Sequence, residues 1–186
     1  MKGFYLALLI VHFTTTGRSQ DSSITLSRFE AFVAQPEINI KVVAAPLSEL
    51  SFYKLSKLVA TDLASGRRST ALKLQSKREN FILPLVEAKG IYIDSAEVNI
   101  VIHTLEGFLS ETEKEAPMHE VIFRYRTGSD LQLSCYYEKL YEGRWVFEID
   151  KVYQKIHSSI PGTQFSFNKK RMKEFLGVLK LAQASM

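Results

Sequence analysis

The second half of the chain interleaves cationic and aromatic side chains along segments in which polar and apolar residues alternate. Cations can hold phosphates and aromatic rings can stack on bases, so this combination is typical of proteins that bind unpaired nucleic acid. An aromatic ring in such a segment can equally belong to a hydrophobic core, whereas a core would not take an unpaired cation. The candidate binding residues are Arg124, Arg126, Tyr136, Lys139, Arg144, Trp145, Lys151, Tyr153 and Lys155.

The distribution of charge favours an anionic partner for this half of the chain. Residues 1–113 contain 12 Lys and Arg and 12 Asp and Glu, whereas residues 114–186 contain 12 and 8, so the whole net charge of +4 lies in the second part. Concentrated positive charge attracts nucleic acid. An ordinary solvated basic surface is the alternative interpretation at this magnitude.

The residue patterns of several catalytic and metal sites are absent. The sequence has no glycine-rich phosphate loop and no Gly-x-Ser-x-Gly turn. Its single cysteine, Cys135, lies inside a strand-like segment, and its 4 histidines are scattered without metal-ligand spacing. We therefore expect a protein that is not an enzyme, forms no internal disulfide and holds neither a cofactor nor a metal.

Residues 1–20 have the pattern of a cleaved leader. A charged start is followed by a short apolar run and then by small residues, with Gly17 and Ser19 suited to a cleavage site. The run is too short for a stable membrane anchor, so we expect no membrane span after its removal. The lack of a glycosylation sequon argues against secretion, and an organellar targeting segment or no leader at all are the alternatives. Location therefore depends on this segment: secreted with a true signal peptide, nuclear or organellar with a nucleic-acid partner.

The remainder of the first half reads as a mixture of strands and helices. Apolar residues spaced as on one helix face predict a helix over 47–64, which ends before Gly66. Alternation of polar and apolar residues predicts the strands. The expected strands are 24–33, 38–43, 70–76, 80–86 and 91–93, and a second helix follows over 95–110.

The second half has a clearer pattern, which begins after a polar linker at 111–117. Alternation is strong there, with Phe123 and Tyr125 on one face and Arg124 and Arg126 on the other. Three antiparallel strands need a hydrophobic cover, which a terminal helix can supply. The expected strands are 118–127, 131–140, 144–156 and 165–167, and the expected helix is 169–182.

A short strand, a helix-capping residue and an amphipathic helix occur twice, 74 positions apart. Asp94 and Asn168 are the two predicted caps, because their side chains can accept hydrogen bonds from first-turn amides. The helix positions that correspond have one apolar stripe each. They are Val98 and Met172, Val101 and Phe175, Ile102 and Leu176, and Leu105 and Leu179. Two copies of such a unit predict a paired, pseudo-symmetric domain, although one strand–cap–helix junction can resemble another by chance.

The C-terminal unit resembles a known family of nucleic-acid-binding modules. Its strand order ends in Phe165-Ser166-Phe167-Asn168, followed by the helix residues Met172, Phe175 and Leu179. This pattern resembles the single-stranded-DNA-binding module of the positive cofactor four transcriptional coactivators. It is also similar in plan to the plant Whirly proteins, the kinetoplastid guide-RNA-binding proteins and the Pur proteins. The resemblance covers 114–183 and, more weakly, 70–110, and the helix expected over 47–64 stands where this plan has strand.

The resemblance implies an α+β fold made of two ββββα-type units, whose antiparallel curved sheets are covered by the C-terminal helices. We expect the first sheet-plus-helix unit within 21–113 and the second unit within 118–186. The outward sheet faces would then carry the binding residues named above. The predicted function is non-enzymatic binding of single-stranded DNA or RNA, by a chain that could form a homo-oligomer. The alternatives are a secreted α+β protein that binds a small molecule or a protein, and a structural subunit of a larger assembly.

Overall fold

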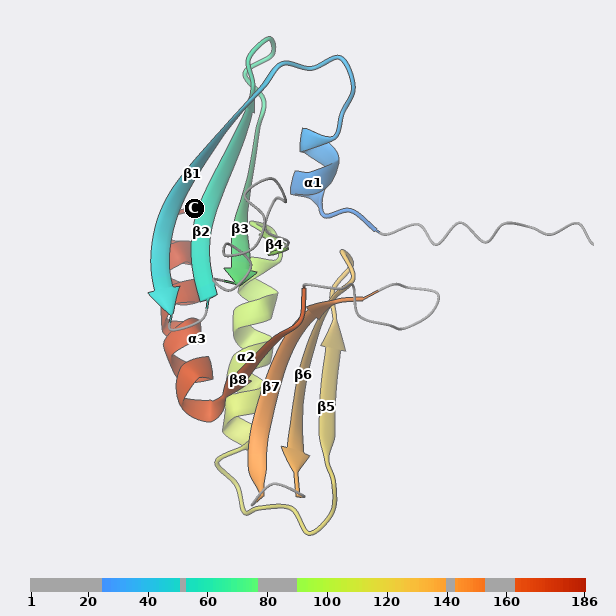
Figure 1. The fold of residues 1–186 in the computed structure, drawn as a ribbon, viewed down its shortest axis with the longest axis vertical. Helices are drawn as coiled ribbons and strands as arrows, with labels where there is room; N and C mark the ends of the chain where they lie inside the picture. Colours follow the sequence, from blue (N-terminus) through green and yellow to red (C-terminus); the bar gives the residue numbers. More distant parts are fainter. Residues whose placement is uncertain (1–24, 51–52, 77–89, 140–142, 153–162) are drawn as a thin grey trace, which may run out of the picture.

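Two runs of four strands, each followed by a helix, make up most of the chain (Figure 1). The computed structural model describes residues 25–50, 53–76, 90–139, 143–152 and 163–186. Sheet A contains, in spatial order, β1 (Ile40–Leu50), β2 (Tyr53–Asp62), β3 (Arg68–Ser76) and β4 (Gly90–Asp94). Sheet B contains β5 (Ile122–Arg126), β6 (Leu131–Glu138), β7 (Arg144–Lys151) and β8 (Phe165–Asn168). The helices are α1 (Arg28–Val33), α2 (Val98–Glu111) and α3 (Lys169–Ala184).

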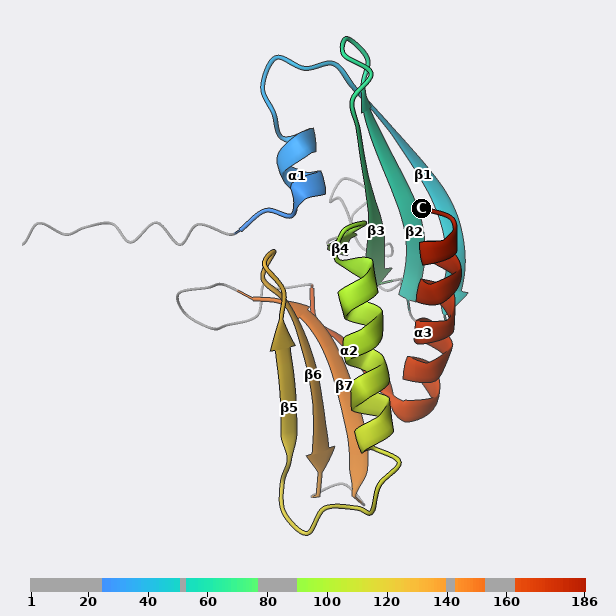
Figure 2. The same ribbon diagram turned by 180° about the vertical axis from the view of Figure 1, so that it is seen from behind.

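All neighbouring strands in both sheets are antiparallel, which confirms the predicted α+β class. The helices α2 and α3 lie side by side on one side of the sheets, nearest the viewer in Figure 2. They run in opposite directions, because the start of α2 meets the end of α3. Gln183 Nε2 donates to Asn99 Oδ1 at 3.1 Å, and Lys173 Nζ lies 2.9 Å from Glu113 Oε1 at the other end.

The inner faces of the two sheets and the buried sides of α2 and α3 share one hydrophobic core. Helix positions that correspond across the 74-residue offset are all buried in it. These positions are Val98, Val101, Ile102 and Leu105 in α2, and Met172, Phe175, Leu176 and Leu179 in α3. The apolar stripe of each helix is therefore buried in the shared core, and the two-unit repeat is visible in the structure.

The tips of the two first hairpins also make matching contacts. At the β1–β2 tip, the Tyr53 hydroxyl donates to the Ser166 carbonyl in β8 at 2.9 Å. At the β5–β6 tip, the Ser129 hydroxyl donates to the Glu97 carboxylate, just after β4, at 2.7 Å. Each unit thus places its first hairpin against the strand-to-helix junction of the other unit.

The helix predicted over 47–64 is wrong, because this region forms most of the β1–β2 hairpin. Both faces of β2 are covered. Leu55 packs in the main core, whereas Leu58 and Ala60 pack on the opposite face under α1. When both faces of a strand are covered, apolar residues occur at consecutive positions and the period of two disappears. The strand predicted over 80–86 lies outside the described residues.

The strand predicted over 24–33 is also wrong, since its end forms the short helix α1. Ser27 and Glu30 make a capping box, in which the Ser27 hydroxyl accepts from the Glu30 amide at 3.1 Å and Glu30 accepts from the Ser27 amide at 2.8 Å. The spacing of this pair is a known helix start. It was the feature of the sequence that could have identified α1.

Only one of the two predicted caps holds. Asn168 caps α3 by accepting from the Arg171 amide at 2.9 Å. Helix α2 starts after Glu97 without a side-chain cap. Asp94 instead accepts from the Arg28 and Phe29 amides, at 2.6 and 3.0 Å, so it caps α1 rather than its own helix.

Candidate nucleic-acid interface

The pleat of sheet B divides the predicted binding residues between two faces. Register pairs Arg124 with Ser134, and Tyr136 with Val146, on the face turned away from α2 and α3. We call this face, with Arg126 and Arg144, the outer face of sheet B. Trp145 and Lys151 lie on the opposite face, because alternate residues of a strand point to opposite sides.

A row of mainly apolar side chains crosses this outer face from β5 to β8. Ile122 pairs with Tyr136, Tyr136 with Val146, and Val146 with Asn168. Ile122 is exposed, whereas Tyr136 and Val146 are half-buried. The row is therefore open to contact by planar groups from solvent.

Arginines lie on both sides of this row. Arg124 is exposed and lies on β5 two residues beyond Ile122. Arg144 lies on the other side and pairs with Glu138, with Nε and Oε2 3.1 Å apart. Arg126 is less accessible, because its Nε lies 3.2 Å from the buried carboxylate of Asp130. Arg124 and Arg144 are thus the better placed cations of the outer face.

One carboxylate in the middle of the face is held by neighbouring hydroxyl groups. Glu148 Oε1 accepts from the Tyr136 hydroxyl at 2.9 Å and from the Ser166 hydroxyl at 3.3 Å. Burial and then the hydrogen bond to Glu148 raise the pKa of Tyr136 to about 12. Tyr136 therefore stays a neutral donor at physiological pH, and its ring is held in a fixed position.

A cavity of about 230 Å³ opens at the end of the row, where β8 gives way to α3. We call it the rim cavity. Arg144 and Trp145, which lie on opposite faces of β7, both line this cavity, together with Arg171 of α3. Its lining residues are Arg144, Trp145, Val146, Ser166, Phe167, Asn168 and Arg171.

Arg171 is the cavity residue that sequence reasoning missed. It belongs to the first turn of α3, and only the fold brings it beside β7. The run of basic residues from 169 to 171, directly after the Asn168 cap, was the available indication. Two arginines at one end of a helix where amides are directed outward favour an anionic group.

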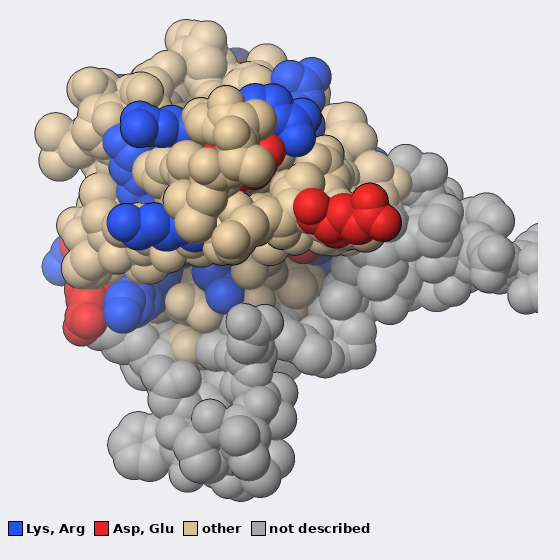
Figure 3. All heavy atoms as spheres, turned by 90° about the horizontal axis from the view of Figure 1, so that it is seen from above, with Lys and Arg blue, Asp and Glu red and all other residues tan. Residues whose placement is uncertain are grey.

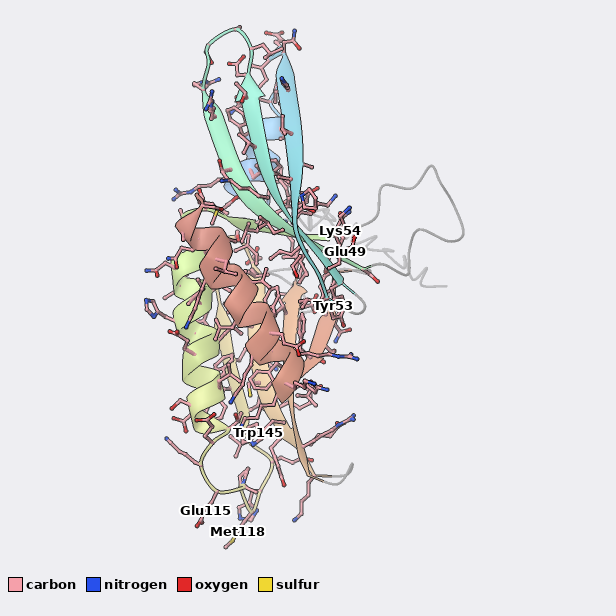
Figure 4. The ribbon with its side chains drawn as sticks, turned by 90° about the vertical axis from the view of Figure 1, so that its left-hand side faces the viewer. Glu49, Tyr53, Lys54, Glu115, Met118 and Trp145 are labelled. Atoms are coloured by element: carbon pink, nitrogen blue, oxygen red, sulfur yellow. The ribbon has the colours of Figure 1, made fainter. Side chains whose placement is uncertain are left out.

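Trp145 is half-buried between the core and the rim cavity. Its ring lies 6.1 Å from Phe123 in a stacked arrangement and 5.3 Å from Tyr137 in an edge arrangement. Figure 4 shows it near the end of the molecule where Glu115 and Met118 lie on the α2–β5 connection. The sequence left open whether Trp145 is a core residue or a ligand contact, and its position allows both.

Lys151 is not available as a binding residue, which corrects the sequence-based assignment. It is only 5% exposed and pairs with Glu30 of α1. It follows Ile149 by two positions on β7, so it points to the inner face. Its ion pair with Glu30 links α1 to sheet B.

The other predicted residues contribute less to the outer face. Lys139 is exposed beyond the end of β6 and donates to the Met118 carbonyl at 3.4 Å. Tyr153 and Lys155 lie outside the described residues. The binding roles of all these residues remain predictions.

Groups that could do other chemistry are few in the described ranges. Burial raises the pKa of the Cys135 thiol to about 12, so it is not a thiolate at neutral pH. In the part of the chain that the structure describes, no three His, Cys, Asp or Glu side chains gather to hold a metal ion. No described helix is both long and apolar enough to cross a lipid bilayer.

A second cavity, of about 300 Å³, lies between α1, the start of α2 and the β5–β6 turn. Its carboxylates already have partners: Asp94 accepts two α1 amides, and Glu97 accepts from Ser129. Burial raises the pKa of Asp94, against the lowering effect of those amide hydrogen bonds. These groups join the two units and α1, and they leave little for a ligand to bind.

Basic side chains also occur on the first unit. Seen from the β2–β3 end of sheet A, Lys and Arg form several separate groups (Figure 3). Arg67 at this end pairs with Asp62 at 3.5 Å and lies over the Phe32 ring, whereas Arg68 is exposed. Exposed cations therefore occur on the first unit as well, although Lys and Arg are balanced there by Asp and Glu over residues 1–113.

No protein-family model matches this chain, and no curated protein sequence matches it with significance.

Proposed function

We propose that this protein is a non-enzymatic single-stranded nucleic-acid-binding protein that uses the outer face of sheet B and the rim cavity. The observation that carries the proposal is the row of Ile122, Tyr136 and Val146. Arg124 and Arg144 lie on its two sides, and the row ends at the rim cavity, which Trp145 and Arg171 also line. Bases of an unpaired strand can lie on the row, because every base offers an apolar face. Arg124 and Arg144 are placed to hold phosphates on either side.

The rim cavity supports the same function. Arg144, Arg171 and Trp145 all line it. A phosphate can bind the two guanidinium groups while the attached base contacts the indole ring. This arrangement gives Trp145 a ligand-binding role without removing it from the core.

The cavities give less support to the alternative of small-molecule binding. Sites for such ligands commonly have volumes of about 300–1,000 Å³ and are mostly apolar. The rim cavity, at about 230 Å³, is smaller than that range. The second cavity reaches only its lower end and is lined by groups that already have partners.

Fluorescence anisotropy with a labelled oligothymidine tests the proposal. We expect binding at low salt that weakens as salt rises, with a slope of about −0.7 for each phosphate contacted. A hairpin duplex of the same charge should compete poorly, because its bases are stacked on one another and cannot contact the row. The absence of oligothymidine binding at low salt would refute the proposed function.

A further inference from the structure

The apolar row on the outer face of sheet B stops at β8, the last strand of that sheet. Its final pair joins Val146 to Asn168, and both residues line the rim cavity. The chain enters α3 directly after Asn168, whose Oδ1 accepts from the Arg171 amide in the first turn at 2.9 Å. That first turn therefore lies at the end of the row, where a nucleic-acid strand that follows the row meets it.

The β1–β2 tip of sheet A lies against the same edge of sheet B. The Tyr53 hydroxyl donates to the Ser166 carbonyl at 2.9 Å, so the tip contacts the side of β8 that faces away from β7. Figure 4 shows Tyr53 where this hairpin meets sheet B. Ser166 also lines the rim cavity. Another part of the molecule thus occupies the space beside β8, and a bound nucleic-acid strand has no straight continuation across it.

Carboxylates lie on both sides of the row near its end. Glu148 follows Val146 as the next outward residue of β7, because alternate residues of a strand share a face. Glu138 lies on the opposite side of the row, with its Oε2 3.1 Å from Arg144 Nε. Both carboxylates repel the phosphates of a strand that turns sideways at the cavity. The rim cavity therefore suits the end of a nucleic-acid strand better than a bend within one.

The arginines of the rim cavity suit a terminal phosphate better than an internal one. Arg144 and Arg171 both line the cavity, and each guanidinium carries five N–H donors in a planar fork. An internal phosphodiester offers two unbridged oxygens and a single negative charge. A phosphate monoester at the end of a strand offers three such oxygens and carries a charge of about −1.5 to −2 at pH 7. Two arginine forks therefore find more acceptors and more charge at a phosphorylated end.

We propose that the rim cavity binds the terminal phosphate of a single nucleic-acid strand, so that the protein selects strands with a phosphorylated end. The phosphate accepts from Arg144 and Arg171, and the last base contacts Trp145. Arg144 keeps its contact with Glu138, because a guanidinium can donate to two partners at once. The volume of about 230 Å³ suits one terminal group rather than several nucleotides.

This inference rests on the proposed function and names the class of strand that the same surface selects. Three unlabelled oligothymidines of one length test it, by competing with an internally labelled oligothymidine in fluorescence anisotropy. One has hydroxyl groups at both ends, one a 5′-phosphate and one a 3′-phosphate. Because a strand has a direction, one phosphorylated end should bind about tenfold more tightly than the hydroxyl-ended strand. A hydroxyl-ended strand two nucleotides longer carries as much charge and should not reproduce this gain.

Two arginine variants show whether the rim cavity causes the preference. In Arg171→Ala, the ratio of the two affinities should fall from about tenfold to nearly one, because a single guanidinium then remains for the terminal oxygens. Arg124→Ala is the matched control, since it removes an arginine of the outer face that does not line the cavity. It should weaken the binding of both strands by the same factor and leave their ratio unchanged.

The outcomes separate this inference from the proposed function. Equal affinities of the native protein for phosphorylated and hydroxyl-ended strands would overturn the inference and leave the proposed function standing. A gain that persists in Arg171→Ala would also overturn it, because the added charge would then act at another part of the surface. If none of the oligothymidines binds, the proposed function fails, and this inference fails with it.

Discussion

The two units have the same order of strands and helix, yet their outer sheet faces differ. On sheet A, α1 covers the outer face: Phe29 is buried there, stacks on Tyr92 at 5.7 Å and packs with Leu58 and Ala60. On sheet B, the corresponding face carries Arg124 and other accessible side chains. The shared fold requires only that the inner faces be buried. The outer faces are not bound by this requirement: one forms a second small core, and the other is a candidate binding surface.

The largest change in the free energy of unfolding should come from weakening the packing of α1 on the outer face of sheet A. Phe29→Ala removes the ring that fills the space between α1 and the sheet, and we expect it to lower the free energy of unfolding by about 3–4 kcal/mol. Urea denaturation measures this. The comparison variant is Tyr136→Ala on sheet B, which should cost about 1 kcal/mol because it removes one hydrogen bond and a ring that is only half-buried. Equal losses in the two variants would mean that the outer faces do not differ as described.

The link between α1 and sheet B should rank next. Breaking a fully buried ion pair costs about 3–5 kcal/mol, and because Glu30 keeps some contact with water we expect about 2–3 kcal/mol for Lys151→Met. Arg124→Ala removes an exposed cation from the same sheet and should change the unfolding free energy by less than about 0.5 kcal/mol. Thermal and urea unfolding of both variants test the assignment of Lys151 to structure. A Lys151 variant of native stability with weakened oligonucleotide binding would return Lys151 to the binding site.

Trp145→Ala should affect both stability and binding, because the ring contacts both the core and the rim cavity. We expect a loss of about 2 kcal/mol in unfolding free energy, below the value for a fully buried ring. Binding of oligothymidine should weaken by about 1–3 kcal/mol, the usual contribution of one stacked base. Trp145→Phe keeps an aromatic face and should recover most of the binding. If Trp145→Ala weakens folding alone, the indole ring belongs only to the core.

The smallest effect concerns the pair of residues that occupy the same position in the repeat, Asp94 and Asn168. Burial raises the folded-state pKa of Asp94 above its usual value of 3.8. Above pH 4 the folded state then binds more protons at this group than the unfolded state, so its contribution to stability falls as pH rises. Asp94→Asn makes the two positions alike and should remove this part of the pH dependence. Unfolding free energies of both proteins between pH 4 and 6 test the sign, and an unchanged dependence would contradict it.

The second unit was easier to predict from sequence because its outer face is open to solvent. Residues on β5 and β7 alternate clearly, so the sides of Arg124 and Phe147 could be assigned. The same alternation places Lys151 on the side of Phe147, and it could have excluded Lys151 from a surface that includes Arg124. In the first unit, α1 covers the second face of β2, and the alternation is lost there.

The parts that could not be predicted depend on contacts between distant segments. Asp94 was expected to cap α2. Its carboxylate instead accepts hydrogen bonds from the backbone amides of Arg28 and Phe29, at the start of α1. Arg171 lines the same cavity as Arg144 only because β8 ends where α3 begins. Neither contact has a spacing in the sequence that would reveal it, because each joins elements whose relative placement comes from the packed core.

The most direct test of the central claim reverses matched charges on the two units and measures oligothymidine affinity. Arg124→Glu with Arg144→Glu changes sheet B, and Lys41→Glu with Arg68→Glu makes the same change in net charge on exposed residues of the first unit. The account predicts that the sheet B variant loses most of its affinity and that its salt slope becomes flatter by about 1.4, the contribution of two phosphates. The first-unit variant should bind nearly as the native protein does. Equal losses in both variants, or native binding by the sheet B variant, would contradict the claim that the outer face of sheet B is the binding surface.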